Sequence, residues 1–241
     1  MRHMTERTVE AFRDDAYLRT CKAKVIEVND RGGVVLDKTV FYATGGGQPG
    51  DVGSIDLENA SVSIGTTIRA GGDIVHVPFE DQPLPTLGSE VTAAIDWNHR
   101  HLLMRMHTAT HLLCSIVPCG VTGGSVGAAK SRIDFDLGGH VLDKQHLHDE
   151  INRLVEEDHK IETVWISREE FDAQPELART MTVKPPADAQ SIRLVKIGDG
   201  VDLQSCGGTH VLSTGEIGRL RVGKIENKGA RNRRVNIHLE E

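Results

Sequence analysis

The chain has 241 residues, enough for one large domain or two small ones, and either could bury a hydrophobic core. Its hydrophobic content of 38% and charged content of 26% are typical of a folded globular protein, which argues against a disordered chain. No apolar run approaches the ~18 residues of a membrane span, so no membrane partner is expected. The net charge of -7 argues against a general nucleic-acid binder but allows a local basic patch. Four irregularly spaced cysteines without an export signal before them predict reduced thiols and a cytoplasmic location.

Residues 1–95 are predicted to form a small β domain. Apolar Cys21, Ala23 and Val25 alternate with lysines, which predicts a strand over 20–29, and a glycine turn at 29–33 leads back into a second strand. That second strand and the further strand candidates span residues 34–41, 61–64, 73–77 and 90–95. The only helix candidate is residues 6–14. Many short strands joined by turns favour a compact barrel-like domain.

The pattern changes at Asp96, a residue type that often caps the start of a helix. Apolar residues then recur at helical spacing until Pro118 and Gly120 end the segment. A second helix is predicted from 142 to 160. Strand candidates are residues 131–136, 161–167, 191–197, 217–226 and 233–239. Residues 96–241 are therefore predicted to be an α+β domain with helices packed on a mostly antiparallel sheet.

Two pairs of metal-ligand residue types stand four positions apart. His107 and His111 lie one turn apart on the same face of the predicted helix, whereas Cys206 and His210 flank a Gly-Gly turn that lets both side chains converge. Three imidazoles and one thiolate suit zinc. Four protein ligands are usual in closed structural sites, so the ligand count leaves a structural and a catalytic role open. The excess of histidine, and the separation of the pairs by about 95 residues, favour a pocket.

Five segments carry a resemblance to a known family: MRMHTATHLL, GGSVGAAKSRIDFD, CGGTHVLSTGEIG, FYATGGGQPGDVG and KIENKGARNRR. In these segments the chain resembles the freestanding alanyl-tRNA editing proteins of the AlaX class, in their medium-length form. It is also similar to the editing domain of alanyl-tRNA synthetases. The resemblance spans residues 23–238, and it implies that His107, His111, Cys206 and His210 hold a zinc ion.

The resemblance implies a hydrolase that deacylates tRNA(Ala) mischarged with serine, and in some members with glycine. Such an editor is needed because a synthetic site for alanine cannot strongly reject serine or glycine. Two alternatives stay open: an editor of Ser-tRNA(Thr), and a non-catalytic zinc module that binds RNA. No Gly-Lys-Ser/Thr follows the glycines of residues 45–50, so they form no phosphate loop and no nucleotide cofactor is expected.

Two groups of residues outside the ligand set are candidates for substrate contacts. The resemblance and the neighbourhood of the motifs suggest Thr122 and Gln204 as residues of the substrate pocket, where the Thr122 hydroxyl would pair with a serine hydroxyl. The C-terminal hairpin is strongly basic in a chain of net negative charge, which predicts contacts with the tRNA backbone. Its candidate tRNA-binding residues are Lys224, Lys228, Arg231, Arg233 and Arg234.

Overall fold

A computed structural model describes residues 7–178, 185 and 189–240. The chain divides into two compact units, each with its own internal contacts. The first comprises Met1–Gly45 and Pro49–His101, and the second comprises Gly46–Gln48 and Leu102–Glu241. The three residues Gly46–Gln48 therefore belong to the second unit, although more than fifty residues separate them from the rest of it. The predicted boundary between the two domains lies between residues 95 and 96, whereas the two units divide after His101.

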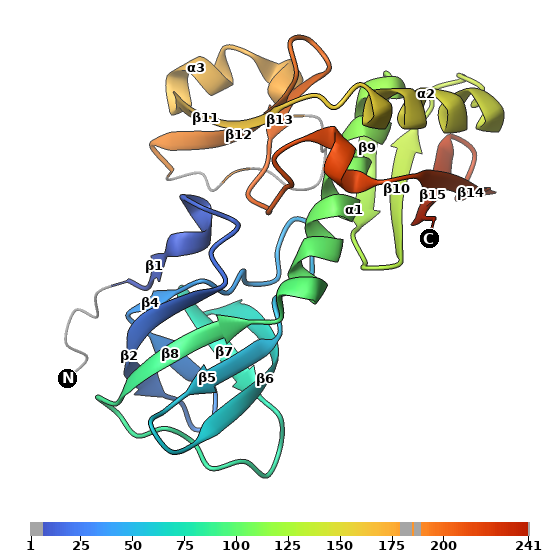
Figure 1. Ribbon diagram of the computed structural model, residues 1–241. Helices are drawn as coiled ribbons and strands as arrows, with labels where there is room; N and C mark the ends of the chain where they lie inside the picture. Colours follow the sequence, from blue (N-terminus) through green and yellow to red (C-terminus); the bar gives the residue numbers. More distant parts are fainter. Residues whose placement is uncertain (1–6, 179–184, 186–188, 241) are drawn as a thin grey trace. The chain divides into compact units, whose positions relative to one another are not determined.

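The first unit is built on a closed six-stranded barrel, which Figure 1 shows in blue to green. Around the barrel the strands follow the order β2, β3, β7, β6, β5 and β8. They span Thr20–Val28, Val34–Leu36, Asp73–Pro78, Ser61–Ala70, Gly53–Asp56 and Glu90–Ile95, respectively. Alternate side chains point inward along each strand, so Val34, Leu36 and Ile55 are fully buried in the barrel core. The predicted barrel-like domain is confirmed.

The predicted N-terminal helix is wrong in the residues that the structure describes. The segment contains the short strand β1 (Val9–Glu10), which pairs with β4 (Lys38–Thr39), and then the 3-10 turn Ala11–Arg13. Residue 6, at the start of the predicted helix, lies outside the described residues. The pairing with β4 explains the difference, because the backbone of Val9 donates its hydrogen bond to Asp37 on another segment.

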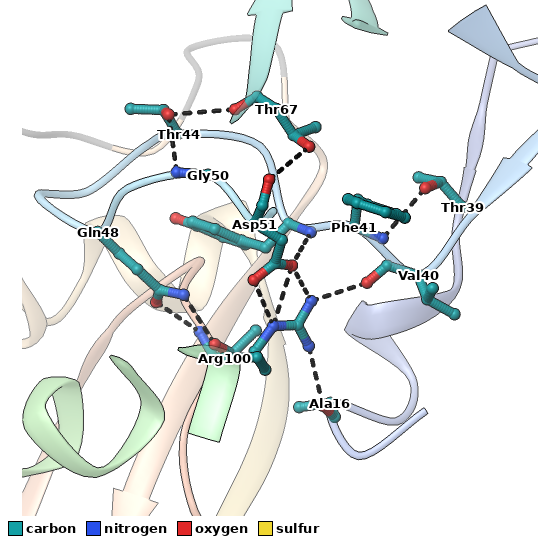
Figure 2. A network of polar contacts seen from close by, with 12 residues as sticks. Ala16, Thr39, Val40, Phe41, Thr44, Gln48, Gly50, Asp51, Thr67 and Arg100 are labelled. Carbon is teal, nitrogen blue, oxygen red and sulfur yellow. Dashed lines mark hydrogen bonds and ion pairs between the residues drawn. The ribbon is translucent and has the colours of Figure 1, made fainter. Parts of the chain in front are cut away.

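A buried ion pair joins the loop after β4 to the end of the first unit. Arg100 and Asp51 are 0% and 1% exposed, and the Arg100 guanidinium contacts both carboxylate oxygens of Asp51 (Figure 2). Its remaining N–H groups donate to the carbonyls of Ala16 and Val40 over 2.9 and 2.7 Å. The backbone N–H of Tyr42 donates to the same carboxylate. The pair is thus fully hydrogen-bonded, which a buried charge requires.

The helices of the second unit begin where their capping residues predict. Helix α1 (Trp97–Ile116) follows Asp96, whose side chain accepts from the backbone N–H of His99. Helix α2 (Lys144–Glu156) begins after Asp143, whose carboxylate accepts two backbone N–H groups. The short helix α3 (Arg168–Asp172) starts with a capping box. The middle of α1 is buried on every side, which places it in the interior of the unit.

Two antiparallel sheets complete the second unit (Figure 1). One has the order β14, β15, β10 and β9, over Leu220–Asn227, Asn232–Leu239, Lys130–Asp136 and Gly120–Ser125. The other has the order β11, β12 and β13, over Ile161–Ser167, Ser191–Ile197 and Asp202–Ser205. The predicted α+β class is confirmed, with its antiparallel strands divided between two sheets. No helix among the described residues has the length and apolar character needed to cross a membrane.

Candidate metal centre

Helix α1 presents the first pair of predicted ligands to the interior of the second unit. His107 and His111 are 4% and 5% exposed, and their ring centroids lie 5.4 Å apart, as expected for side chains one helical turn apart. Burial removes both rings from water, so each nitrogen needs a partner inside the protein.

The second pair comes from the loop after β13. The loop is held by Arg193 of β12, whose guanidinium donates to the carbonyls of Cys206 and Gly208 over 2.8 and 3.0 Å. Gly208 packs directly on His107, because a Cβ atom at this position would lie 2.2 Å from the imidazole ring. A side chain at residue 208 would therefore displace His107, which explains why the turn between Cys206 and His210 needs glycine here.

The four predicted ligands meet in one cluster. The candidate ligand atoms of His107, His111, Cys206 and His210 all lie within 4.8 Å of one another. The Cys206 Sγ is 3.5 Å from Nε2 of His107 and 3.3 Å from Nε2 of His210. Around a tetrahedral zinc ion, sulfur and nitrogen ligands would be about 3.5 Å apart. The donor set and its spacing therefore fit a tetrahedral metal ion.

Each histidine of the cluster directs Nδ1 at a partner outside it. Nδ1 of His111 is 3.0 Å from the carboxylate of buried Asp202, which also accepts from the amide of Gln204. Nδ1 of His210 is 3.1 Å from the Thr108 hydroxyl. Because these acceptors hold the proton on Nδ1, they leave Nε2 free to bind a metal, the arrangement common at metal-binding histidines.

In the metal-free chain the pKa values of three residues of the cluster are shifted by their neighbours. Burial lowers the pKa of His111, but hydrogen bonds to Asp202 and Cys206 outweigh burial and raise it to about 10. Burial raises the pKa of the Cys206 thiol, yet the imidazoles of His107 and His210 hold it well below its usual value. Burial and the charge of His107 lower the pKa of His210. The lowered pKa of Cys206 favours the thiolate, the form in which cysteine binds a metal.

A cavity of about 240 Å³ opens beside the cluster, lined by His107, His111 and Cys206. Much of its remaining wall is glycine backbone from three separate segments, contributed by Gly46, Gly47, Gly123, Gly124 and Gly207. The segments are tied together, since the N–H of Val126 donates to the carbonyl of Gly47 over 2.8 Å. The glycines carry no side chains into the cavity, which leaves room for a small ligand next to the cluster.

The two predicted pocket residues have different positions. Gln204 lines the cavity, where its amide donates to Asp202 over 2.8 Å. Thr122 is not among the lining residues that the structure describes: its hydroxyl faces the sheet, 3.2 Å from the carbonyl of Asp134 and 3.5 Å from the amide oxygen of Asn232. Thr110, which sequence reasoning missed, does line the cavity.

Several positive charges of the hairpin formed by β14 and β15 are neutralised by ion pairs, so its net positive charge is lower than its sequence indicates. Arg231 and Arg234 pair with Asp136 and Asp134 of β10, over 2.9 and 2.8 Å, and Lys228 pairs with Glu226 over 3.1 Å. These aspartates lie about a hundred positions earlier in the sequence, so a local count of charges omits them. Two predicted tRNA-binding residues, Lys224 and Arg233, form no ion pair within the described part of the chain.

Comparisons with known proteins relate the chain to alanyl-tRNA editing proteins and alanine–tRNA ligases. Residues 3–99 match the family described as tRNA synthetases class II (A), and residues 192–236 match the threonyl and alanyl tRNA synthetase second additional domain. The alanyl-tRNA editing protein AlaX-M of Methanosarcina acetivorans is 36% identical over 93% of this chain and 96% of its own length. The alanine–tRNA ligase of Pyrobaculum arsenaticum is 40% identical over 91% of this chain, which spans 25% of the ligase. The AlaX-L protein of Pyrococcus horikoshii is 34% identical, with 54% of its length covered.

Proposed function

The chain belongs to the family of the AlaX-M alanyl-tRNA editing proteins, and from this premise we propose that it hydrolyses the ester bond of Ser-tRNA(Ala) and Gly-tRNA(Ala) in the cytoplasm. Membership confirms the predicted enzyme class, an aminoacyl-tRNA hydrolase. One observation carries the proposal for the substrate: the cluster of His107, His111, Cys206 and His210 opens into a cavity whose glycine walls suit a small amino acid.

The bound ion is zinc in this proposal. Three imidazoles and one thiolate, whose ligand atoms all lie within 4.8 Å of one another, form a donor set that suits zinc. When bound, zinc would supply Lewis acidity next to the ester carbonyl. The chain's own residues orient the ligands, through hydrogen bonds from His111 to Asp202 and from His210 to Thr108.

Serine differs from alanine by one hydroxyl, so discrimination needs a polar partner in the cavity. Thr110 meets this requirement because its hydroxyl donates to the carbonyl of His107 over 2.6 Å, which leaves oxygen lone pairs to accept from a ligand. The hydroxyl of Thr122 is engaged on the sheet instead. The geometry therefore favours Thr110 over the sequence candidate Thr122.

We expect Thr110→Val to lower the ratio of serine to alanine deacylation rates about fivefold, the effect of losing one neutral hydrogen bond of about 1 kcal/mol. The substitution keeps the shape of the side chain and removes only the hydroxyl. Thr122→Val is the matched variant and should leave the ratio near that of the unmodified protein. Initial rates on both substrates measure the effect, and a fall in the ratio for Thr122→Val alone would reverse the assignment.

We expect the unpaired cations of the hairpin to contribute most to tRNA binding. Removing one cation that binds a phosphate should reduce the log-log slope of affinity against salt by roughly one unit. Lys224→Ala and Arg233→Ala should each show this reduction. Arg231→Ala should show less, because Asp136 already neutralises its charge. Binding titrations at several salt concentrations give the slopes, and four identical curves, that of the unmodified protein included, would exclude the hairpin as a tRNA surface.

A deacylation assay separates the proposed substrate from the alternatives. The purified protein should release serine from Ser-tRNA(Ala), act more slowly on Ser-tRNA(Thr), and leave Ala-tRNA(Ala) intact. A preference for Ser-tRNA(Thr) would identify the chain as an editor of the threonine system. Binding of tRNA without release of any amino acid would identify a non-catalytic module.

A further inference from the structure

Gln48 lies in the segment Gly46–Gln48 and is completely buried in the second unit. Its amide makes three contacts there, and Figure 2 shows the side chain reaching away from the segment. Nε2 donates to the Thr209 hydroxyl over 2.8 Å, Oε1 accepts from the backbone N–H of Thr209 over 3.1 Å, and Oε1 is 2.8 Å from Nδ1 of His107. One side chain therefore links both metal-ligand motifs.

The backbone N–H of Thr209 determines which atoms donate and which accept in these hydrogen bonds. A backbone N–H can only donate, so the atom of Gln48 that faces Thr209 N must be the amide oxygen. The same oxygen faces Nδ1 of His107, and two acceptors would repel each other at 2.8 Å. Nδ1 of His107 must then carry a proton, so that Nε2, which faces Cys206, is the nitrogen placed to bind a metal.

No other contact of the described residues offers an acceptor to Nδ1 of His107, whereas His111 and His210 are held by Asp202 and Thr108. Without Gln48 the imidazole of His107 could rotate or adopt the other tautomer, in which Nε2 carries the proton and cannot bind a metal. The tie to Thr209 also fixes the loop that carries Cys206 and His210.

We propose that Gln48 is a positioning residue of the metal centre: it fixes His107 as the tautomer with the proton on Nδ1 and joins the first ligand pair to the second. The proposal rests on the proposed zinc site, and it assigns a role to a residue that precedes His107 by 59 positions. Gln48 itself touches neither metal nor substrate in this role. Its effect is therefore on metal affinity rather than on a chemical step.

Gln48→Met tests the proposal, because methionine has similar length and no hydrogen-bonding amide. Zinc affinity, measured by competition with a chromophoric chelator, should fall about 10- to 100-fold. The zinc affinity of Gln48→Glu should stay within about threefold of that of the unmodified protein. Its carboxylate can still accept hydrogen bonds from His107 and from the backbone N–H of Thr209, and the Thr209 hydroxyl can turn to donate to it. Gln145→Met, an exposed position on α2, is the matched control and should not change the affinity.

A spectroscopic measurement reports the tautomer directly. In the zinc-loaded protein, nitrogen NMR of His107 should show a proton on Nδ1, and this signal should be lost or shifted in Gln48→Met but retained in Gln48→Glu. Thermal unfolding of each variant checks that the fold is intact. The positioning role of Gln48 would be overturned if Gln48→Met bound zinc as tightly as the unmodified protein, or if Gln48→Met and Gln48→Glu lost equal zinc affinity. Neither result would overturn the metal site itself. Failure of the unmodified protein to bind zinc would overturn the proposed metal site as well.

Discussion

Replacing Cys206 with alanine is expected to remove tightly bound zinc and to slow the hydrolysis of Ser-tRNA(Ala) by about a thousandfold or more. The thiolate is the only anionic member of the ligand cluster, and its sulfur lies 3.3 and 3.5 Å from two imidazole nitrogens. A metal acting on a carbonyl contributes several kcal/mol to a reaction barrier, and each 1.36 kcal/mol changes the rate tenfold. His111→Ala should have a similar effect.

The matched control is Cys119→Ala, since Cys119 is a partly buried cysteine outside the cluster. Elemental analysis after dialysis against a chelator should find about one zinc per chain in the unmodified protein and in this control, and little in Cys206→Ala. Full zinc content and full activity in Cys206→Ala would show that the cluster is not the metal site.

Replacing Arg100 with methionine is expected to lower the free energy of unfolding of the barrel unit by about 3–5 kcal/mol. The change leaves the carboxylate of Asp51 buried, 1% exposed, without its counter-charge. It also leaves the carbonyls of Ala16 and Val40 without their donors. Breaking one side of a buried, fully hydrogen-bonded pair therefore costs much more than breaking a pair on the surface.

The two tryptophans allow this unfolding to be followed in one unit. Trp97 belongs to the barrel unit and Trp165 to the other, so a Trp165→Phe background leaves fluorescence that reports the barrel unit in a urea titration. Arg153→Met is the matched control, because Arg153 is an exposed arginine of α2 that pairs with Glu150 and Glu157, and it should change the midpoint little. An equally small change for Arg100→Met would contradict the stabilising role of the buried pair.

Local patterns in the sequence predicted the four residues of the candidate metal cluster and most of the regular structure. The spacing of His107 and His111 is a property of the helix itself, and the glycines before His210 signal a turn, so both pairs could be recognised without a structure. The start of α1 follows from Asp96 in the same way. Strands such as β8 could be predicted because apolar and polar residues alternate regularly along them and turns mark where each strand begins and ends.

The features that sequence reasoning missed depend on contacts between distant residues. Strand β9, Gly120–Ser125, has three glycines and no apolar alternation, and it exists because it pairs with β10. Gln48 and Asp202 contact histidines 59 and 91 positions away, and no local pattern marks either residue. The charge of the hairpin was overestimated for the same reason, since Asp134 lies 100 positions before its partner Arg234.

Zinc-dependent editing can be measured as the release of serine from Ser-tRNA(Ala) by one preparation in three states: as purified, after removal of metal, and after one equivalent of zinc is restored. We expect rapid release by the first and third states, a rate at least about a hundredfold lower for the metal-free state, and no comparable release from Ala-tRNA(Ala). Equal release by the metal-free and zinc-restored protein, or equal hydrolysis of the serine and alanine esters, would contradict this expectation.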